Sequence, residues 1–123
     1  MKTQWRAVED IGPDQKKEGT TVAKADVLLQ FNVDDAEKFG QYRVSAAPTI
    51  RASGGKVLVA ANSADVREGA LQAKLVTIIE FPSREAAETW YASPEYAAVR
   101  HLRHEAGSEE SLAFLEGFEP PVA

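Results

Sequence analysis

The chain has 123 residues, with 14 lysines and arginines against 19 aspartates and glutamates, 44% apolar residues and no cysteine. This length suits one domain with one hydrophobic core, and the lack of cysteine excludes disulfides, thiolate metal sites and a cysteine nucleophile. The net charge of -5 argues against a nucleic-acid partner, because phosphate binding needs clustered lysine and arginine, and no apolar run is long enough to predict a membrane span.

Residues 1–23 are polar and contain glycine and proline, so they are predicted to form an N-terminal arm. Its apolar residues Trp5, Val8 and Ile11 recur every third position. They form either one helical turn that docks through the tryptophan or part of a mobile terminus. Charges among the first ten residues interrupt the apolar segment that a secretory signal needs, so we expect a cytoplasmic protein.

Residues 25–33 alternate between apolar and polar side chains, which predicts a strand with one buried face. Two aspartates follow and offer an N-cap for a helix whose apolar positions continue to Ser53. Pro48 lies inside this helix and lacks the backbone N–H of a helical turn. We therefore expect a break or kink near Ala47.

Two further strands are predicted after a pair of glycines ends the helix. Residues 56–61 and 74–81 are rich in β-branched and other apolar residues, and both strands are apolar on both faces. A polar segment separates them, and Pro82 ends the second strand.

Serine residues mark the start of two consecutive helices. Ser83 is the predicted N-cap of the first, and Ser93 precedes a proline at the first position of the second, which runs to about Glu105. Gly107 ends that helix, and residues 111–118 are predicted to form the last strand.

The order strand, helix, strand, strand, helix pair, strand is the β-α-β-β-α-β arrangement of an α+β, ferredoxin-like fold with an antiparallel sheet. Its helices cover one sheet face. The later strands are apolar on both faces, so the other face would expose more apolar surface than a monomer usually carries. We therefore expect an isologous homodimer in which the same face of a second copy covers the sheet. The domain spans 24–118, and 119–123 form a short tail.

Several motifs resemble the domain of unknown function 1330 family over residues 24–118. The main one is the run from Ile79 to Ala87, followed by Trp90-Tyr91 and by Ser93-Pro94-Glu95-Tyr96. Shorter motifs agree in order, namely Tyr42-Arg43, Pro48-Thr49-Ile50, Gly54-Gly55, Glu68-Gly69 and Glu116-Gly117. The resemblance implies a dimeric α+β barrel. Relatives with that architecture include cofactor-independent monooxygenases, isomerases and dismutases, whereas the family itself has no assigned reaction.

Glu80 is the candidate for proton transfer, because burial beside Ile79 and Phe81 would raise the pKa of its carboxyl. The alternative, which we favour, is a structural ion pair between Glu80 and Arg43 or Arg103.

Arg43 follows Tyr42 on the apolar side of the first helix. Its guanidinium either binds a carboxylate substrate or lies along the sheet edge. Thr49, directly after Pro48, either presents its hydroxyl to a ligand or caps the resumed helix.

Trp90 is assigned to the core, whereas Tyr91 and Tyr96 are the better cleft candidates because their hydroxyls need partners. His101 and His104 share a helix face but alternate with arginines, so a solvated face is favoured over a metal site. No glycine-rich phosphate loop precedes a helix. We therefore predict no metal and no cofactor.

Three functions remain open at this point: a binding protein for a small organic metabolite, a cofactor-independent isomerase or monooxygenase that uses Glu80, and a structural or interaction dimer. For the first two, the predicted cleft lies between sheet and helices. Its candidate residues are Tyr42, Arg43, Thr49, Glu80, Tyr91, Tyr96 and Arg103.

Overall fold

The computed structural model describes residues 23–119 and 121, so the predicted arm, with its possible turn at Trp5, lies outside the described residues apart from Ala23. The described chain contains four strands and three helices. Their order is β1 (Ala25–Val33), α2 (Ala36–Ala52), β2 (Lys56–Ala61), β3 (Leu75–Phe81), α3 (Arg84–Ala92), α4 (Pro94–Ala106) and β4 (Gly107–Glu116).

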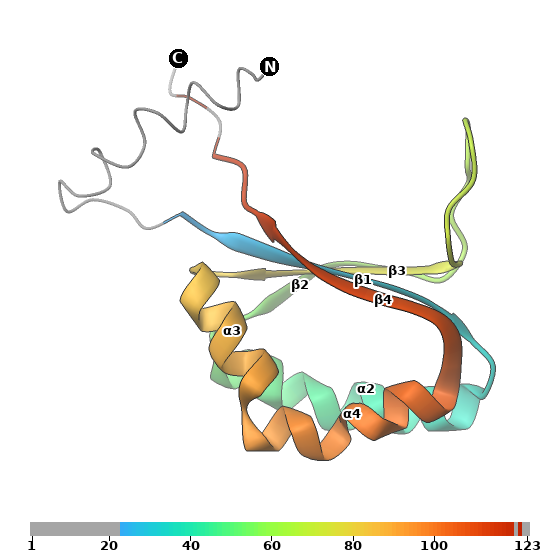
Figure 1. Ribbon diagram of the computed structural model, residues 1–123, viewed down its shortest axis with the longest axis horizontal. Coiled ribbons are helices and arrows are strands. Elements are labelled where there is room, and N and C mark those ends of the chain that lie inside the picture. The colour runs from blue at the N-terminus through green and yellow to red at the C-terminus, as the bar shows by residue number, and fades with distance from the viewer. Residues whose placement is uncertain (1–22, 120, 122–123) are drawn as a thin grey trace, which may run out of the picture.

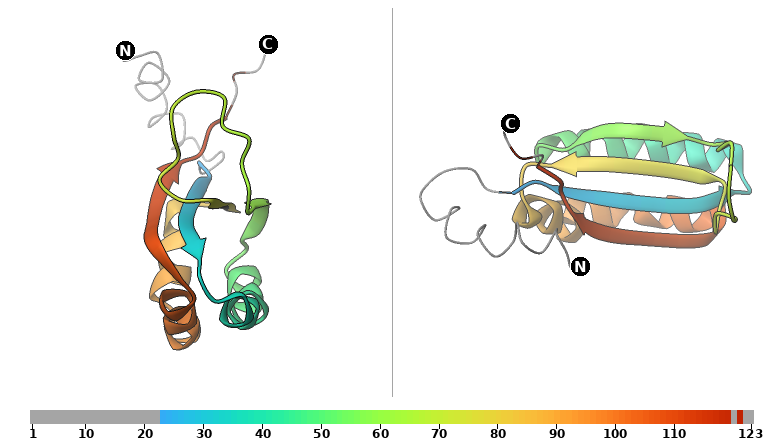
Figure 2. Two further views of the ribbon diagram at one scale, coloured as in Figure 1. Left: turned by 90° about the vertical axis from the view of Figure 1, so that its right-hand side faces the viewer. Right: turned by 90° about the horizontal axis from the view of Figure 1, so that it is seen from above.

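The strands form one antiparallel sheet in the order β2-β3-β1-β4, and the three helices lie on one side of it (Figure 1). Seen from above, the four strands run side by side over α2 and α4 (Figure 2). The predicted α+β, ferredoxin-like fold is confirmed. Both predicted serine N-caps are also present, because Ser83 Oγ accepts from Ala86 N at 3.0 Å and Ser93 Oγ from Tyr96 N at 3.1 Å.

Of the break or kink predicted near Ala47, the break is wrong, because α2 runs without interruption through Pro48. The proline deprives the carbonyl of Val44 of its helical donor. Val44 is 76% exposed, so water can bind that carbonyl on the solvent side. On the opposite side, Ala46 and Ile50 are buried against the sheet and hold the helix in place.

The last strand begins earlier than predicted, at Gly107 instead of Ser111, and ends at Glu116 instead of Phe118. It follows α4 without a connecting loop, and the carbonyl of Ala106 accepts from the backbone amides of Asp34 and Asp35, directly after β1, at 2.7 and 2.9 Å. The register shifts between Gln30 and Asn32, where Glu109 adopts a positive φ of 54°. The residues of this bulge are polar and do not alternate with apolar ones, so apolar alternation could not predict the start of the strand.

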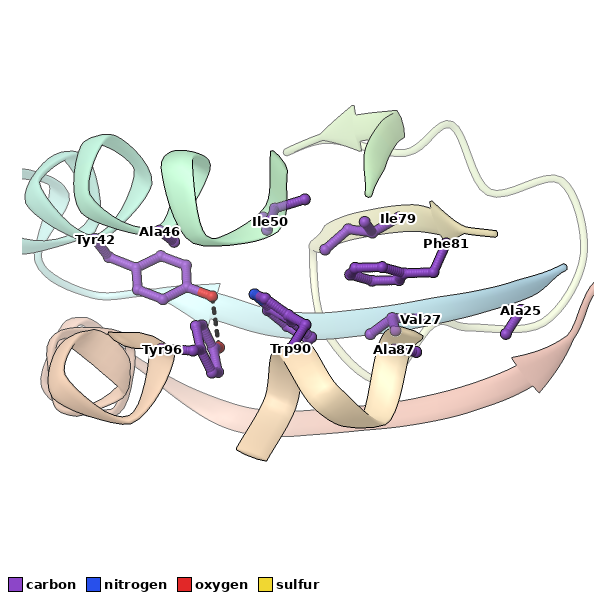
Figure 3. Close-up of a cluster of buried hydrophobic side chains, with 10 residues drawn as sticks. All are labelled: Ala25, Val27, Tyr42, Ala46, Ile50, Ile79, Phe81, Ala87, Trp90 and Tyr96. Atoms are coloured by element: carbon purple, nitrogen blue, oxygen red, sulfur yellow. Dashed lines mark hydrogen bonds between the residues drawn. The ribbon is translucent and has the colours of Figure 1, made fainter. Parts of the chain in front are cut away.

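The core fills the space between the helices and the sheet. Val27 and Phe81 from the strands pack with Trp90 of α3 and Tyr96 of α4, and all four are at most 1% exposed (Figure 3). Trp90 is therefore a core residue, as expected.

The opposite face of the sheet, which we call the open face, carries the alternate side chains of each strand. No described helix covers it (Figure 1). Register places Leu28, Val76, Ile78, Val59 and Leu115 on this face, at least one residue from each strand. Residues 62–74 project from the end of β2 and β3 on the same side (Figure 1). The fold thus separates a filled helix side from an apolar open face.

Candidate functional site

Three polar side chains meet inside the helix side of the core, and we call them the tyrosine–arginine cluster: Tyr42 of α2, and Tyr96 and Arg103 of α4. The two phenol oxygens are 2.8 Å apart (Figure 3), and Arg103 Nη1 donates to Tyr96 Oη at 3.0 Å. Burial raises the pKa of both tyrosines above the usual phenol value. Both hydroxyls therefore stay protonated at neutral pH and can serve as neutral hydrogen-bond donors.

Arg103 is the charged member of the cluster and is only 4% exposed. Burial acts to lower its pKa, but the two phenol oxygens and Glu110 outweigh burial and raise it. Arg103 Nε donates to Glu110 Oε1 at 3.1 Å, and the same carboxylate lies 3.0 Å from His104 Nδ1. The carboxylate compensates the buried charge and connects it to the exposed end of α4.

Arg100 lies beside the cluster, with its guanidinium carbon 4.3 Å from the ring centroid of Tyr91 and 5.4 Å from that of Tyr96. One of its Nη atoms donates to the backbone carbonyl of Tyr91 at 2.9 Å. Its Nε is buried and has no hydrogen-bond partner among the described residues. A buried donor without an acceptor is costly, so this atom needs a partner that the described chain does not supply.

The two hydroxyls leave a second donor unused. A hydrogen bond between Tyr42 and Tyr96 consumes one hydroxyl proton, and Arg103 already donates to Tyr96. The other hydroxyl proton therefore has no acceptor among the described residues. The helix side is rich in donors and poor in acceptors.

Thr49 and Trp90 form a separate polar contact. Thr49 Oγ1 donates to the carbonyl of Ala46 at 2.6 Å and accepts from Trp90 Nε1 at 3.1 Å. The hydroxyl of Thr49 is thus engaged on both sides and satisfies the indole of Trp90. Because α2 does not restart after Pro48, Thr49 caps no resumed helix.

Arg43 and Glu80 lie apart from the cluster. Arg43 is exposed on α2, with its guanidinium carbon 5.7 Å from the ring centroid of Phe39. Glu80 alternates with buried Ile79 and Phe81 and so points to the open face. It pairs with Lys24 Nζ at 3.8 Å, so the predicted ion pair with Arg43 or Arg103 is wrong.

The structure therefore brings together Tyr42, Tyr91, Tyr96 and Arg103 from the predicted set. Sequence reasoning missed Arg100 and Glu110 as members of this region. A signal existed for Arg100, because it follows Tyr96 by four residues and so shares its helix face. Glu110 gave none, because it lies in the bulge that hid the start of β4.

Between residues 23 and 119, no group of three histidines or carboxylates is placed to hold a metal ion. Nor does any helix there have the length and apolar character needed to cross a bilayer.

Solved structures with this fold include a protein of unknown function from Rhodopseudomonas palustris, at a TM-score of 0.69 and 20% identity, covering 87% of this chain and 92% of that one. SnoaB, a cofactor-independent oxygenase from Streptomyces nogalater, has a TM-score of 0.60 and 12% identity, covering 80% and 97%. A dimeric ferredoxin-like protein of unknown function from Thermobifida fusca has a TM-score of 0.54 and 9% identity, covering 77% and 92%. At these identities the likeness concerns the fold alone.

No curated protein is significantly similar to the chain. The family profile matches residues 15–118, so it begins within residues 1–23, the segment predicted to be an N-terminal arm. This match spans most of the chain, and the fold is the one found in the dimeric α+β barrel superfamily. The chain belongs to the family described as Domain of unknown function (DUF1330).

Proposed function

We propose that the protein is a homodimer in which each subunit binds a small organic acid beside the tyrosine–arginine cluster. The observation that carries the binding proposal is the pair of unused donors, Arg100 Nε and one phenol proton, next to the buried Arg103 cation. A carboxylate offers acceptor lone pairs and a negative charge, so it suits a region with these donors and a buried cation.

A ligand would approach from the side of Tyr91 and Arg100, because these two are half-buried whereas Tyr42, Tyr96 and Arg103 are buried. The Nε atom of Arg100 is itself inaccessible, so its side chain would have to swing away from the ring of Tyr91 when an acid binds. The freed tyrosine ring would then offer an apolar surface, which favours an acid with an aromatic or other planar body.

A catalytic role for Glu80 receives no support from its position, because the sheet separates its side chain from the tyrosine–arginine cluster. The likeness to an oxygenase concerns the fold and does not identify a reaction. Binding without catalysis is therefore the function that the geometry supports best.

Benzoate is a suitable probe for the binding site. We expect it to shift the NMR signals of Tyr91, Tyr96 and Arg100, whereas uncharged benzyl alcohol should not. Arg100→Met keeps an unbranched apolar stem but removes the guanidinium, so it should weaken benzoate binding by about tenfold, the effect of one charge-assisted hydrogen bond.

Arg67→Met is the matched control, because Arg67 is exposed in the 62–74 segment and pairs only with Asp65 among the described residues. It should bind benzoate like the wild type. Equal losses in both variants, or equal binding of the alcohol, would contradict the site. Failure of benzoate and of other planar acids to bind would favour the structural or interaction dimer.

The open face is the basis for the proposed dimer and would form its interface. Its apolar residues span all four strands, and Val59 and Leu115 are 38% and 44% exposed. The projecting segment lies on the same side of the sheet (Figure 1), and its sequence contains the exposed apolar residues Val66 and Leu71. A surface with apolar residues on every strand fits the same surface of a second copy, and one solved structure of this fold is described as dimeric.

Ile78→Asp is expected to raise the dimer dissociation constant by about a hundredfold or more. Ile78 lies on the open face, so in a two-fold dimer each subunit would place one charge within the apolar interface. Sedimentation equilibrium at micromolar concentration measures the change. Val44→Asp is the control, since Val44 is exposed on α2 on the helix side of the sheet. A monomeric wild type, or equal dissociation of both variants, would count against the open face as the interface.

A further inference from the structure

Two carboxylates lie directly opposite each other on the open face. Asp26 of β1 and Glu80 of β3 are cross-strand partners in the register of the sheet. Like charges in this position repel each other, and the strand pair gains nothing from holding both ionised. Protonation of either carboxyl would remove this repulsion.

The neighbours of Asp26 do little to stabilise its carboxylate charge. On β4 its cross-strand partner is Leu115, and along β1 the next residue on the same face is Leu28. Its Oδ1 is buried and has no hydrogen-bond partner among the described residues. Asp26 thus has one carboxylate oxygen shielded from water, at the margin of an apolar surface.

The cations near the pair face Glu80 more closely than Asp26. Lys24 Nζ lies 3.8 Å from Glu80 Oε2, and Lys56 of β2 is the cross-strand partner of Glu80. No ion pair of Asp26 is present in the described structure. Of the two acids, Asp26 is therefore the one that forms no ion pair within the described structure, although Lys24 still acts on it from a distance.

We propose that protonation of Asp26 controls the association of the two subunits, so that the sheet-to-sheet dimer tightens as the pH falls. This inference rests on the proposed homodimer and specifies how its interface is regulated. When a second copy covers the open face, it removes water from Asp26 in both subunits, and the protonated carboxyl loses less by this than the ionised one.

The sign follows from linkage. Burial, and then the charge of Glu80, already raise the pKa of Asp26 in the single subunit, against the opposing effect of Lys24. Further burial in the dimer raises that pKa again, so the dimer holds more protons than two separate subunits over the interval between the two pKa values. Association therefore strengthens as pH falls through this interval.

The test is sedimentation equilibrium of the full chain at about pH 5 and about pH 7.5, and we expect the dimer dissociation constant to be at least about tenfold smaller at the lower pH. Asp26→Asn imitates the protonated carboxyl. It should dimerise more tightly than wild type at the higher pH and lose most of the difference between the two pH values. Glu88→Gln, an exposed acid on α3 that pairs with Arg84, is the matched control and should keep the wild-type difference.

The outcomes separate the two proposals. A dimer with the same dissociation constant at both pH values, a dimer weakened in acid, or an Asp26→Asn variant that keeps the full pH dependence would overturn this inference and leave the homodimer standing. A wild-type chain that is monomeric at both pH values would overturn the homodimer together with its regulation.

Discussion

Replacement of Trp90 by alanine is expected to lower the free energy of unfolding by about 3–5 kcal/mol. Trp90 is 1% exposed, and its ring centroid lies 4.2 Å from that of Tyr96 and 5.4 Å from that of Phe81. Removing the indole leaves a cavity between α3, α4 and the sheet and deprives Thr49 of its donor. Urea unfolding measures the loss, at a fixed protein concentration because subunit association would add to the apparent stability.

Val44→Ala is the control for this experiment. Val44 is also helical, but it is 76% exposed and packs against no described core cluster. Its replacement should change the free energy of unfolding by less than about 0.5 kcal/mol. A loss at Trp90 of similar size would mean that the aromatic core contributes little to stability.

The strands and helices were accessible from the sequence wherever apolar periodicity and capping residues agreed. β1 has the predicted bounds, and Ser83 and Ser93 cap α3 and α4 as expected. Prediction failed where tertiary contacts overrode a local rule. Buried Ala46 and Ile50 keep α2 continuous past Pro48, and pairing with the end of β1 extends β4 back to Gly107.

The candidate site was only partly accessible, because its members come from segments far apart in the chain. Tyr42 and Tyr96 are separated by 54 positions, and nothing in the sequence specifies the contact between their hydroxyls. Glu80 was ambiguous for another reason. Its strand is apolar on both faces, so only the observed packing of Ile79 and Phe81 shows which face Glu80 occupies.

The sheet thus divides two proposed roles between its faces. The helix side holds neutral phenols, a buried cation and unused donors, which suit an acidic ligand. The open face holds apolar side chains and Asp26, an acid with a buried oxygen that has no hydrogen-bond partner among the described residues, and these suit a proton-sensitive contact between subunits. A ligand effect on dimerisation would need a coupling through the sheet, where the alternate residues of β1 and β3 contribute to both faces.

Gly107→Ala is expected to destabilise the fold by about 3 kcal/mol, the upper part of the range for overpacking. Gly107 joins α4 directly to β4, and a Cβ atom there would clash with the backbone oxygen of Asn32 and the ring of Phe31. The backbone oxygen cannot rotate away, because the end of β1 is paired with β4. Gly40→Ala is the matched control: nothing lies within 4 Å of its added Cβ, so it should stabilise α2 by about 0.5–1 kcal/mol. Thermal unfolding of both variants measures the contrast, and equal shifts would show that the junction between α4 and β4 tolerates a side chain.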